Sequence, residues 1–433
     1  MIKIKNLLWV SLFCCSMATA QNKISMPSKQ YLMSGCENKI FVQTFMKNEY
    51  LGGDIVRFEG NAGYASGGIR EKYAAIDQPK CGDSIIFKLY DGESFEVKDS
   101  KTSVICAGDP SVKGAPVTVQ FFGDSFTKGC YFKDAFLERG LVPDAKLIGT
   151  RTVSGHEGQY HEGRGGWTVA KYFSNNAKSD NFHNPFLQPT DEKIQYWGSV
   201  EFWKISVMIN KTEGKGLPFS IRYNCGEYNT SRFGDDGLLI SPKKGDMMYR
   251  DGYIVWDGKR WKSTAEPTEW EFDYGKYLKM WEFDAPQFLV VMLGLNDFRD
   301  GSLPFDFETW NMRVNKILKS YKAAVPSGRM ILTTPCTSCG VLDNERGDFT
   351  TRQNAMMWYV RENIIANFDN REDEGIYVVD ASATIDNENG YNMKGELQTG
   401  NPHPYPNYPQ LGVPIAACVQ YYRGDLISPK NTF

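Results

Sequence analysis

Val117-Thr-Val-Gln-Phe-Phe-Gly-Asp-Ser125, which continues into Phe-Thr-Lys-Gly-Cys130, is the most informative stretch of this chain. Its apolar run is typical of a strand that is buried on both faces, as in a parallel sheet covered by helices. Gly123 permits a turn, so we expect Ser125 where the strand ends and a helix begins. Ligands of open α/β sheets bind at that edge. A serine there can be a nucleophile, or it can simply cap the helix.

The rest of the chain after residue 117 alternates strand and helix patterns. Tyr131 to Gly140 looks helical, and Lys146 to Thr152 looks like a strand. Further strands are expected at 287–293, 329–334 and 376–380, with helices at 310–324 and 352–368 and a last helix ending near Tyr422. This alternation predicts a doubly wound α/β domain. Asn296 and Asp297 follow one of these strands, so they should face the same crevice as Ser125.

The segment before residue 117 has a different pattern. Short alternating runs, at Lys39–Phe45, Asp54–Phe58 and Ser84–Tyr90, are separated by Gly, Asn and Asp. This pattern predicts a β-sandwich-like N-terminal domain over residues 21–116, which ends in a linker from Gly108 to Pro116. Residues 117–433 form the second domain. The first domain contains no histidine and no recognisable catalytic cluster.

The N-terminus predicts export. Residues 1–20 combine Lys3 and Lys5, an apolar run from Leu7 to Cys15, and Ala18-Thr-Ala20, as in a cleavable signal peptide. We therefore expect a periplasmic or extracellular protein. Later segments lack the uninterrupted apolar length of a membrane span. The net charge of −3 and the lack of a basic block do not favour nucleic acid as a partner.

Glycine and histidine are dense in the loop from Ser154 to Trp167. Its glycines let the backbone approach a ligand, although a flexible loop is an equal alternative. His156 and His161 suit substrate contact or surface exposure better than a metal site, and His183 suits the surface. Arg164 and Trp167 can shape a pocket or hold the loop. No metal, nucleotide or flavin motif of useful strength is present, so no cofactor is predicted.

Residues 168–286 are irregular and rich in tryptophan, and we expect a β-rich insertion. It holds six of the ten tryptophans: Trp197, Trp203, Trp256, Trp261, Trp270 and Trp281. They can stack on a glycan or fill the core of the insertion. Further on, Cys336-Thr-Ser-Cys339 favours a local disulfide or free thiols over a metal or redox site, because a second such pair is absent.

Four blocks occur in order: Gly-Asp-Ser125, Gly-Arg-Gly-Gly166, Gly-Leu-Asn296-Asp and His403-Pro. Together they resemble the SGNH hydrolase superfamily, also called GDSL-type esterases and lipases, in its secreted carbohydrate-esterase-like form. The resemblance covers about residues 117–425, and it implies a flavodoxin-like doubly wound parallel sheet. It also implies that Ser125 is the nucleophile and His403 the general base. The oxyanion hole would consist of the Ser125 and Gly166 N–H groups and the Asn296 side-chain amide.

One part of the family pattern is missing. Similar enzymes carry an aspartate three residues before the histidine, and this chain has Gly400 there. Either a Ser-His dyad operates or another acid holds the imidazole. Candidate acids are Glu396, Asp380 and Asp386.

The predicted activity is ester hydrolysis through an acyl-enzyme. The predicted partner is an acylated carbohydrate that loses O-acetyl or other small acyl groups. One alternative is a lipase or acylhydrolase acting on lipid esters, although no strongly apolar lid is evident. Another is a glycan-binding or surface-interaction protein on a catalytically impaired fold, which Gly400 favours. The sequence predicts neither the sugar nor the oligomeric state.

Overall fold

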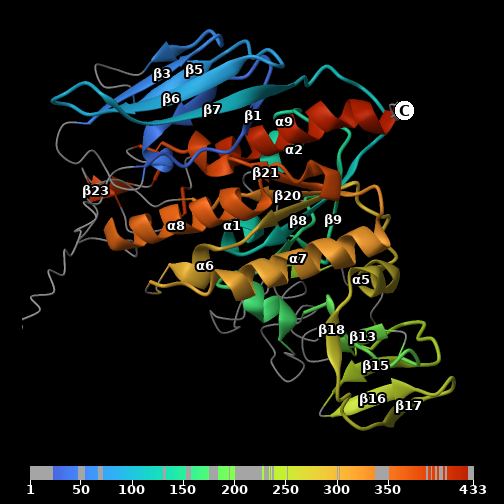
Figure 1. Ribbon diagram of the computed structural model, residues 1–433. Coiled ribbons are helices and arrows are strands. Elements are labelled where there is room, and N and C mark those ends of the chain that lie inside the picture. The colour runs from blue at the N-terminus through green and yellow to red at the C-terminus, as the bar shows by residue number, and fades with distance from the viewer. Residues whose placement is uncertain are drawn as a thin grey trace, which may run out of the picture.

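The structure is a computed structural model (Figure 1). It describes residues 23–46, 54–66, 72–129, 133–152, 158–174, 184–194, 196–199, 227–228, 234, 236, 238–250, 252–299, 301, 303–336, 351–386, 389–391, 393–394, 397–398, 403–404 and 407–427. The predicted signal peptide, His156, His183, Glu396 and Gly400 lie outside these residues.

A parallel sheet forms the centre of the molecule, as the sequence predicts. Its strands lie in the order β11-β8-β19-β20-β21, and β9 pairs with the same edge of β8 as β11. Their bounds are β8 Thr118–Gly123, β9 Lys146–Ile148, β11 Glu162–Gly163, β19 Phe288–Met292, β20 Arg329–Thr333 and β21 Ile376–Val379. Every residue of β8, β19 and β21 is buried, which is why these strands appear in the sequence as continuous apolar runs.

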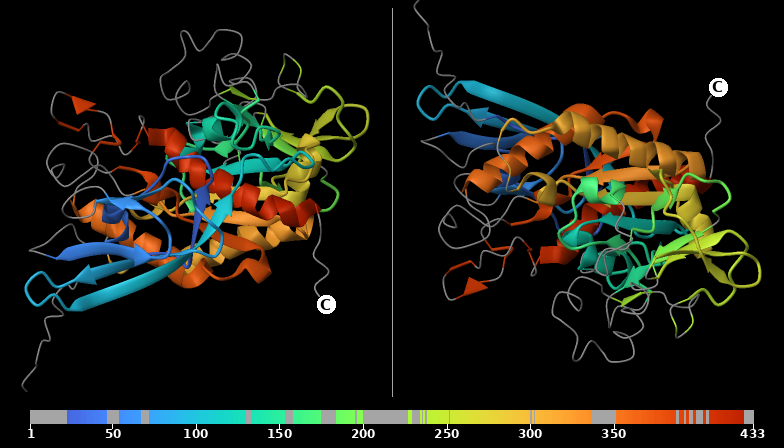
Figure 2. Two further views of the ribbon diagram at one scale, coloured as in Figure 1. Left: turned by 90° about the horizontal axis from the view of Figure 1, so that it is seen from above. Right: turned by 90° about the horizontal axis from the view of Figure 1, so that it is seen from below.

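Helices cover both faces of this sheet, which makes the domain mixed α/β. Their bounds are α1 Ser125–Lys128, α2 Asp134–Leu137, α5 Tyr274–Trp281, α6 Leu295–Phe298, α7 Phe307–Ala324, α8 Thr351–Phe368 and α9 Tyr408–Ile427. On one face α5 packs on α7, and α7 is joined to α8 by hydrogen bonds between Asn311 and Asn363. On the other face α2 packs on α9 (Figures 1 and 2). Among the described residues, no helix is long and apolar enough to cross a membrane.

Two predicted elements of this domain are shorter than expected. The helix predicted from Tyr131 to Gly140 is the short α2, although residues 130–132 are not described. The strand predicted from Lys146 to Thr152 divides into β9 and β10 (Arg151–Thr152). It divides because β10 leaves the sheet and pairs instead with β14 (Glu227–Tyr228).

The N-terminal strands form two sheets around one apolar core. One sheet has the order β1-β7-β6-β3 and the other β2-β5-β4. The bounds are β1 Lys29–Met33, β2 Asn38–Phe41, β3 Ile55–Gly60, β4 Ala65–Ser66, β5 Tyr73–Ile76, β6 Ser84–Tyr90 and β7 Val97–Gly108. The strand predicted at Lys39–Phe45 changes into a 3₁₀ helix at Val42–Phe45.

These N-terminal sheets are not isolated from the rest of the molecule. β1 and β7 pack against α9, and the side chain of Tyr31 contacts the rings of Tyr421 and Tyr422. On α8, the indole of Trp358 donates to the Phe45 carbonyl at 3.0 Å. The N-terminal strands thus lie along the α/β part, at the top of Figure 1.

The described residues of the region predicted as a β-rich insertion form short strands, and they also include a helix, α5, that belongs elsewhere. Its sheet has the order β13-β15-β16-β17, and a separate pair joins β12 to β18. The bounds are β12 Leu187–Pro189, β13 Tyr196–Ser199, β15 Asp246–Tyr249, β16 Tyr253–Trp256, β17 Trp261–Ser263 and β18 Trp270–Phe272. Helix α5 also falls within residues 168–286, but it packs on α7 and belongs to the α/β layers.

The remaining elements are short. They are the 3₁₀ helices at Val169–Phe173, Glu372–Glu374 and Ala381–Thr384, and the paired strands β22 Met393–Lys394 and β23 Leu397–Gln398.

Candidate active site

Ser125 is the first residue of α1, directly after β8 and Asp124. A Cβ atom on Gly123 would lie 2.1 Å from the Met292 carbonyl oxygen of β19, so only glycine permits this approach of the two strands. Asp124 caps the helix by accepting a hydrogen bond from the Phe126 N–H at 2.9 Å. The cap is therefore Asp124, and the Ser125 hydroxyl is not required for it. Ser125 is half-buried at the carboxyl end of the strand.

The strands that follow β8 in the chain lie on both of its edges, so the strand order changes direction at β8. β9 and β11 pair with one edge of β8, and β19 pairs with the other. The crevice outside such a reversal is where open α/β sheets bind ligands. Ser125 follows β8, and Asn296 follows β19 in helix α6.

Asn296 connects the two loops that carry the other predicted oxyanion donors. Its Nδ2 donates to the Trp167 carbonyl at 3.2 Å and lies 3.4 Å from Asp124 Oδ2. Trp167 follows Gly166, and Asp124 precedes Ser125. The structure therefore brings Ser125, Gly166 and Asn296 together through their immediate chain neighbours.

Gly166 lies in a tight turn after β11. Its φ of 72° is in the left-handed region that favours glycine, and the Trp167 N–H donates to the Arg164 carbonyl across the turn at 3.2 Å. The Arg164 N–H donates to the Gly123 carbonyl at 2.8 Å. The turn is thereby fixed to the end of β8, next to Ser125.

Buried charges hold this loop. Arg164 forms an ion pair with Glu162 at 2.8 Å, and its guanidinium lies 5.1 Å from the centre of the Trp167 ring. Glu162 also accepts hydrogen bonds from the Thr150 N–H at 2.6 Å and the Tyr277 hydroxyl at 2.8 Å. Of the two predicted roles for Arg164 and Trp167, holding the loop is the one that their burial and contacts support.

The prediction of substrate contact or surface exposure was wrong for His161. This side chain is 1% exposed, and its Nδ1 accepts a hydrogen bond from the Gly163 N–H at 2.9 Å. Burial, together with the neighbouring cations Lys133, Arg151 and Arg164, holds the pKa of His161 well below its usual value. A neutral, buried ring that accepts a backbone hydrogen bond is a structural part of the loop.

His403 lies against the residue that follows Ser125. The centres of its ring and the Phe126 ring are 4.8 Å apart, and its Nδ1 forms a hydrogen bond with the Tyr408 hydroxyl. Burial, together with the cations Arg299 and Lys128, lowers the pKa of His403 to about 4. The imidazole is therefore neutral at pH 7, as a general base must be.

Two carboxylic acids, Asp124 and Asp297, follow strands β8 and β19. Burial, together with the charge of Asp297, raises the pKa of Asp124 to about 7. Burial also raises the pKa of Asp297 to about 6, against the opposing hydrogen bond from the Val169 N–H at 2.8 Å. Both groups therefore titrate near neutral pH.

The candidate substitutes for the missing acid are engaged elsewhere or not described. Asp380 pairs with Arg361 and accepts from the Thr334 hydroxyl at 2.9 Å. Asp386 accepts from the Asn389 N–H at 3.0 Å, and Glu396 is outside the described residues. Sequence reasoning missed Tyr408, because a tyrosine five residues after a histidine matches no known signal.

Cys336 follows β20 and is a buried free thiol, whereas Cys339 is not described. Burial raises the pKa of Cys336, so its thiol is protonated at neutral pH. Within the described part of the chain, no three His, Cys, Asp or Glu side chains gather as a metal site would require.

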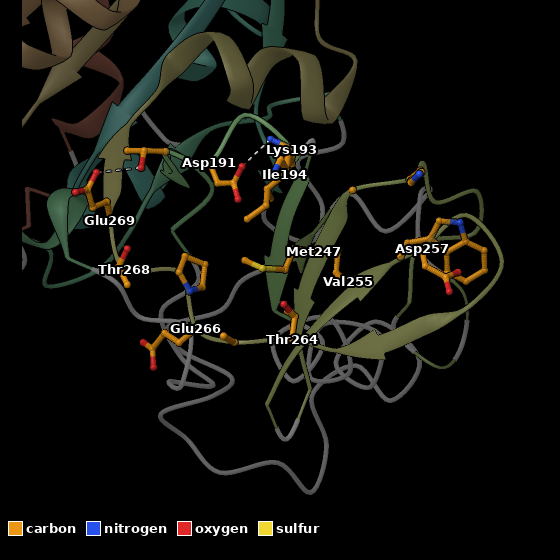
Figure 3. Close-up of a pocket in the computed structure, with 16 residues that line it drawn as sticks. Asp191, Lys193, Ile194, Met247, Val255, Asp257, Thr264, Glu266, Thr268 and Glu269 are labelled. Carbon is orange, nitrogen blue, oxygen red and sulfur yellow. Dashed lines mark hydrogen bonds between the residues drawn. The ribbon is translucent and has the colours of Figure 1, made fainter.

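A separate pocket of about 780 Å³ lies in the insertion. Figure 3 shows Ile194, Met247 and Val255 between Glu266 and Glu269 on one side and Asp257 on the other. Of the described residues that line this pocket, none is a predicted site residue.

The comparisons with known proteins give weak likenesses. No family model and no curated protein matches the chain. One similar solved structure is an acetyl esterase mutant with an acetate ion, at 12% identity and a TM-score of 0.34, covering 72% of this chain and 99% of that chain. Another is a carbohydrate esterase family 2 enzyme plus carbohydrate binding domain from Corynascus thermopiles (Myceliophthora fergusii), at 11% identity and a TM-score of 0.33, covering 90% and 92%.

A third similar structure is a family two carbohydrate esterase from Clostridium thermocellum in complex with cellohexaose. It is 10% identical with a TM-score of 0.30, covering 91% of this chain and 94% of that chain. All three are esterases by name. Because the TM-scores are this low, their activities are not transferred to this chain.

Proposed function

We propose that this chain is a serine ester hydrolase with the SGNH hydrolase fold, in which residues 117–433 form the catalytic domain. The topology of the sheet supports this proposal. The strands lie in the order β9-β8-β19-β20-β21, so the first strand of the domain, β8, lies inside the sheet. Ser125 follows β8, at the point where the strand order changes direction. The N-terminal sheets would be its β-sandwich-like companion domain.

The observation that carries the proposal is the pair of contacts made by the Asn296 amide. By reaching Trp167 and Asp124, this amide joins the Gly166 turn to the Ser125 turn. In this proposal the donors to the oxyanion come from three separate segments of the chain: the N–H groups of Ser125 and Gly166, and the Asn296 Nδ2. An oxyanion hole requires such fixed donors, because they cost no reorganisation when charge develops.

The proposed reaction proceeds in two steps. Ser125 Oγ attacks the ester carbonyl while Nε2 of His403 takes the hydroxyl proton, and the carbonyl oxygen becomes an oxyanion. The C–O bond to the alcohol then breaks, the imidazolium returns its proton to the departing alcohol, and the acyl group remains on Ser125. Water repeats the sequence: His403 removes its proton, and the acid leaves as Oγ recovers a proton.

The proposed substrate is a carbohydrate that bears O-acetyl or other small acyl groups. The tryptophans of the insertion support this choice, because indole rings can stack on a sugar. The signal-peptide pattern of residues 1–20 supports a periplasmic or extracellular location.

The test is acetate release by the purified chain from p-nitrophenyl acetate and from acetylated polysaccharides, alongside Ser125→Ala. Release that depends on Ser125 from a polysaccharide is the expected result. Release from the small ester alone would keep the chemistry and reject the polysaccharide. Folded protein without release from either compound, but with affinity for the glycan, would favour the glycan-binding alternative.

A further inference from the structure

In a catalytic imidazole, the hydrogen bond made by one ring nitrogen fixes the tautomer, and thereby whether the other nitrogen is free to act as the base. In His403 the Nδ1 atom forms a hydrogen bond with the Tyr408 hydroxyl. Tyr408 is in the first turn of α9 and is 1% exposed. When Nδ1 carries the proton and donates it to an acceptor, Nε2 keeps its lone pair for the serine.

We propose that Tyr408 is the positioning residue of His403. Its hydroxyl oxygen accepts a hydrogen bond from the Nδ1–H group and takes the place of the carboxylate that the sequence lacks at Gly400. This inference rests on the proposed ester hydrolase function and adds to it the group that orients the base.

The packing around Tyr408 supplies the rigidity that this role requires. The rings of Phe126, His403 and Tyr408 form a mutual contact, with centres 4.8 Å apart for Phe126 and His403, 5.7 Å for Phe126 and Tyr408, and 6.0 Å for His403 and Tyr408. Phe126 follows Ser125 directly. The same aromatic cluster therefore fixes the hydroxyl, the imidazole and the turn that carries the nucleophile.

A hydroxyl does only part of what a carboxylate does. It can select the tautomer and the orientation of the ring, but it carries no negative charge to stabilise the imidazolium. The pKa of His403, lowered to about 4 mainly by burial, agrees with a neutral partner. Such a weak base suits an ester better than an amide, because cleavage of an amide depends more on proton transfer to its leaving group.

Tyr408→Phe removes this oxygen and retains the ring. We expect kcat for p-nitrophenyl acetate to fall on the order of 100-fold, since general acid–base catalysis contributes about 10²–10⁴-fold, while KM changes little. Tyr321→Phe is the matched control, because the Tyr321 hydroxyl is also buried and donates to the Pro286 carbonyl at 2.8 Å. Thermal unfolding of both variants measures the cost of losing a buried hydroxyl, and the control should keep the wild-type kcat.

The nitrogen chemical shifts of His403 test the inference without turnover. The chain has four histidines, so His403→Gln assigns the signal. The wild type should carry its proton on Nδ1 at neutral pH, and Tyr408→Phe should shift the population toward Nε2–H. A wild-type ring protonated on Nε2, or a Tyr408→Phe variant with the kcat of Tyr321→Phe, would overturn the role of Tyr408. Failure of the proposed function would look different: the wild type itself would show no Ser125-dependent hydrolysis, whatever its tautomer.

Discussion

Two buried acids occupy corresponding places in the sheet and have opposite surroundings. Asp380 follows β21, where both of its carboxylate oxygens meet the guanidinium of Arg361. Asp124 follows β8, where its partners are the Phe126 N–H and the more distant Asn296 amide. Burial, and to a smaller extent the charge of Asp297, raise its pKa. The first acid is matched by a cation, and the second is buried close to another acid.

The difference separates a structural anchor from a reactive site. The Nε of Arg361 also donates to the Ser25 carbonyl at 2.8 Å, so this pair joins α8 to the N-terminal segment. Asp124 holds the turn of Ser125 while its own protonation changes near neutral pH. A buried acid that is paired with a cation stabilises the folded structure. Groups with strongly shifted pKa values, in contrast, are found most often in active sites.

The largest effect should come from Ser125→Ala, which tests the proposed reactive site next to Asp124. We expect kcat to fall by about 10⁴-fold or more, because the nucleophile is lost. The free energy of unfolding should change by less than about 0.5 kcal/mol, because Asp124 provides the helix cap. Ester hydrolysis and urea unfolding measure the two quantities, and Ser174→Ala, at an exposed serine, is the control. Unchanged hydrolysis by Ser125→Ala would refute the reactive site.

Arg361→Met tests the anchor. It leaves Asp380 buried without its cation, so we expect the free energy of unfolding to fall by about 3–5 kcal/mol. Urea unfolding followed by tryptophan fluorescence measures this loss. Adding Asp380→Asn should recover part of the stability, because no charge then remains buried. Wild-type stability in the single variant would contradict the assignment of this pair as an anchor.

Asn296→Ala should act on the rate rather than on the fold. Loss of one oxyanion donor typically lowers kcat by about 10²–10³-fold, and KM should change much less. The steady-state kinetics of ester hydrolysis provide the measurement. Asn311→Ala, which removes the amide pair with Asn363 between α7 and α8, is the control and should lower stability while leaving kcat unchanged. Equal kcat in Asn296→Ala and the wild type would exclude the amide from the oxyanion hole.

The prediction with the smallest change per step of the measurement concerns the pH dependence of stability. The pKa of Asp124 is raised from 3.8 to about 7 in the folded protein, so the folded state binds more protons than the unfolded state between these values. Its contribution to stability is therefore present at low pH and is lost as pH rises toward 7, by at most about 1.4 kcal/mol per pH unit.

Asp124→Asn should remove this slope, because an amide oxygen can still accept from the Phe126 N–H. The difference in unfolding free energy between variant and wild type, measured from pH 4 to 8, is the test. Asp306→Asn changes an exposed helix cap whose pKa is lowered, so its difference should be flat above pH 5. A flat difference for Asp124→Asn as well would show that the carboxyl is not buried in an unfavourable state.

Much of the sheet could be predicted because its strands are buried on both faces. The strands Thr118–Gly123, Phe288–Met292 and Ile376–Val379 consist mostly of apolar residues. The polar residues that follow each of them are therefore easy to recognise in the sequence. Predictions failed where distant partners decide the outcome. The backbone of His161 pairs with Arg151 and its buried ring accepts from the Gly163 N–H, whereas α5 is a helix of the α/β layers because it packs on α7.

Local sequence patterns suffice to predict the parallel sheet and to find the four blocks that carry Ser125, Gly166, Asn296 and His403, since apolar runs and short motifs are local properties of the chain. Three contacts come from tertiary packing alone: Asn296 joins two loops, Arg361 pairs with Asp380, and Tyr408 forms a hydrogen bond with Nδ1 of His403. These are contacts of individual atoms between separate elements. They depend on how helices α8 and α9 pack against the sheet, and no local pattern records that packing.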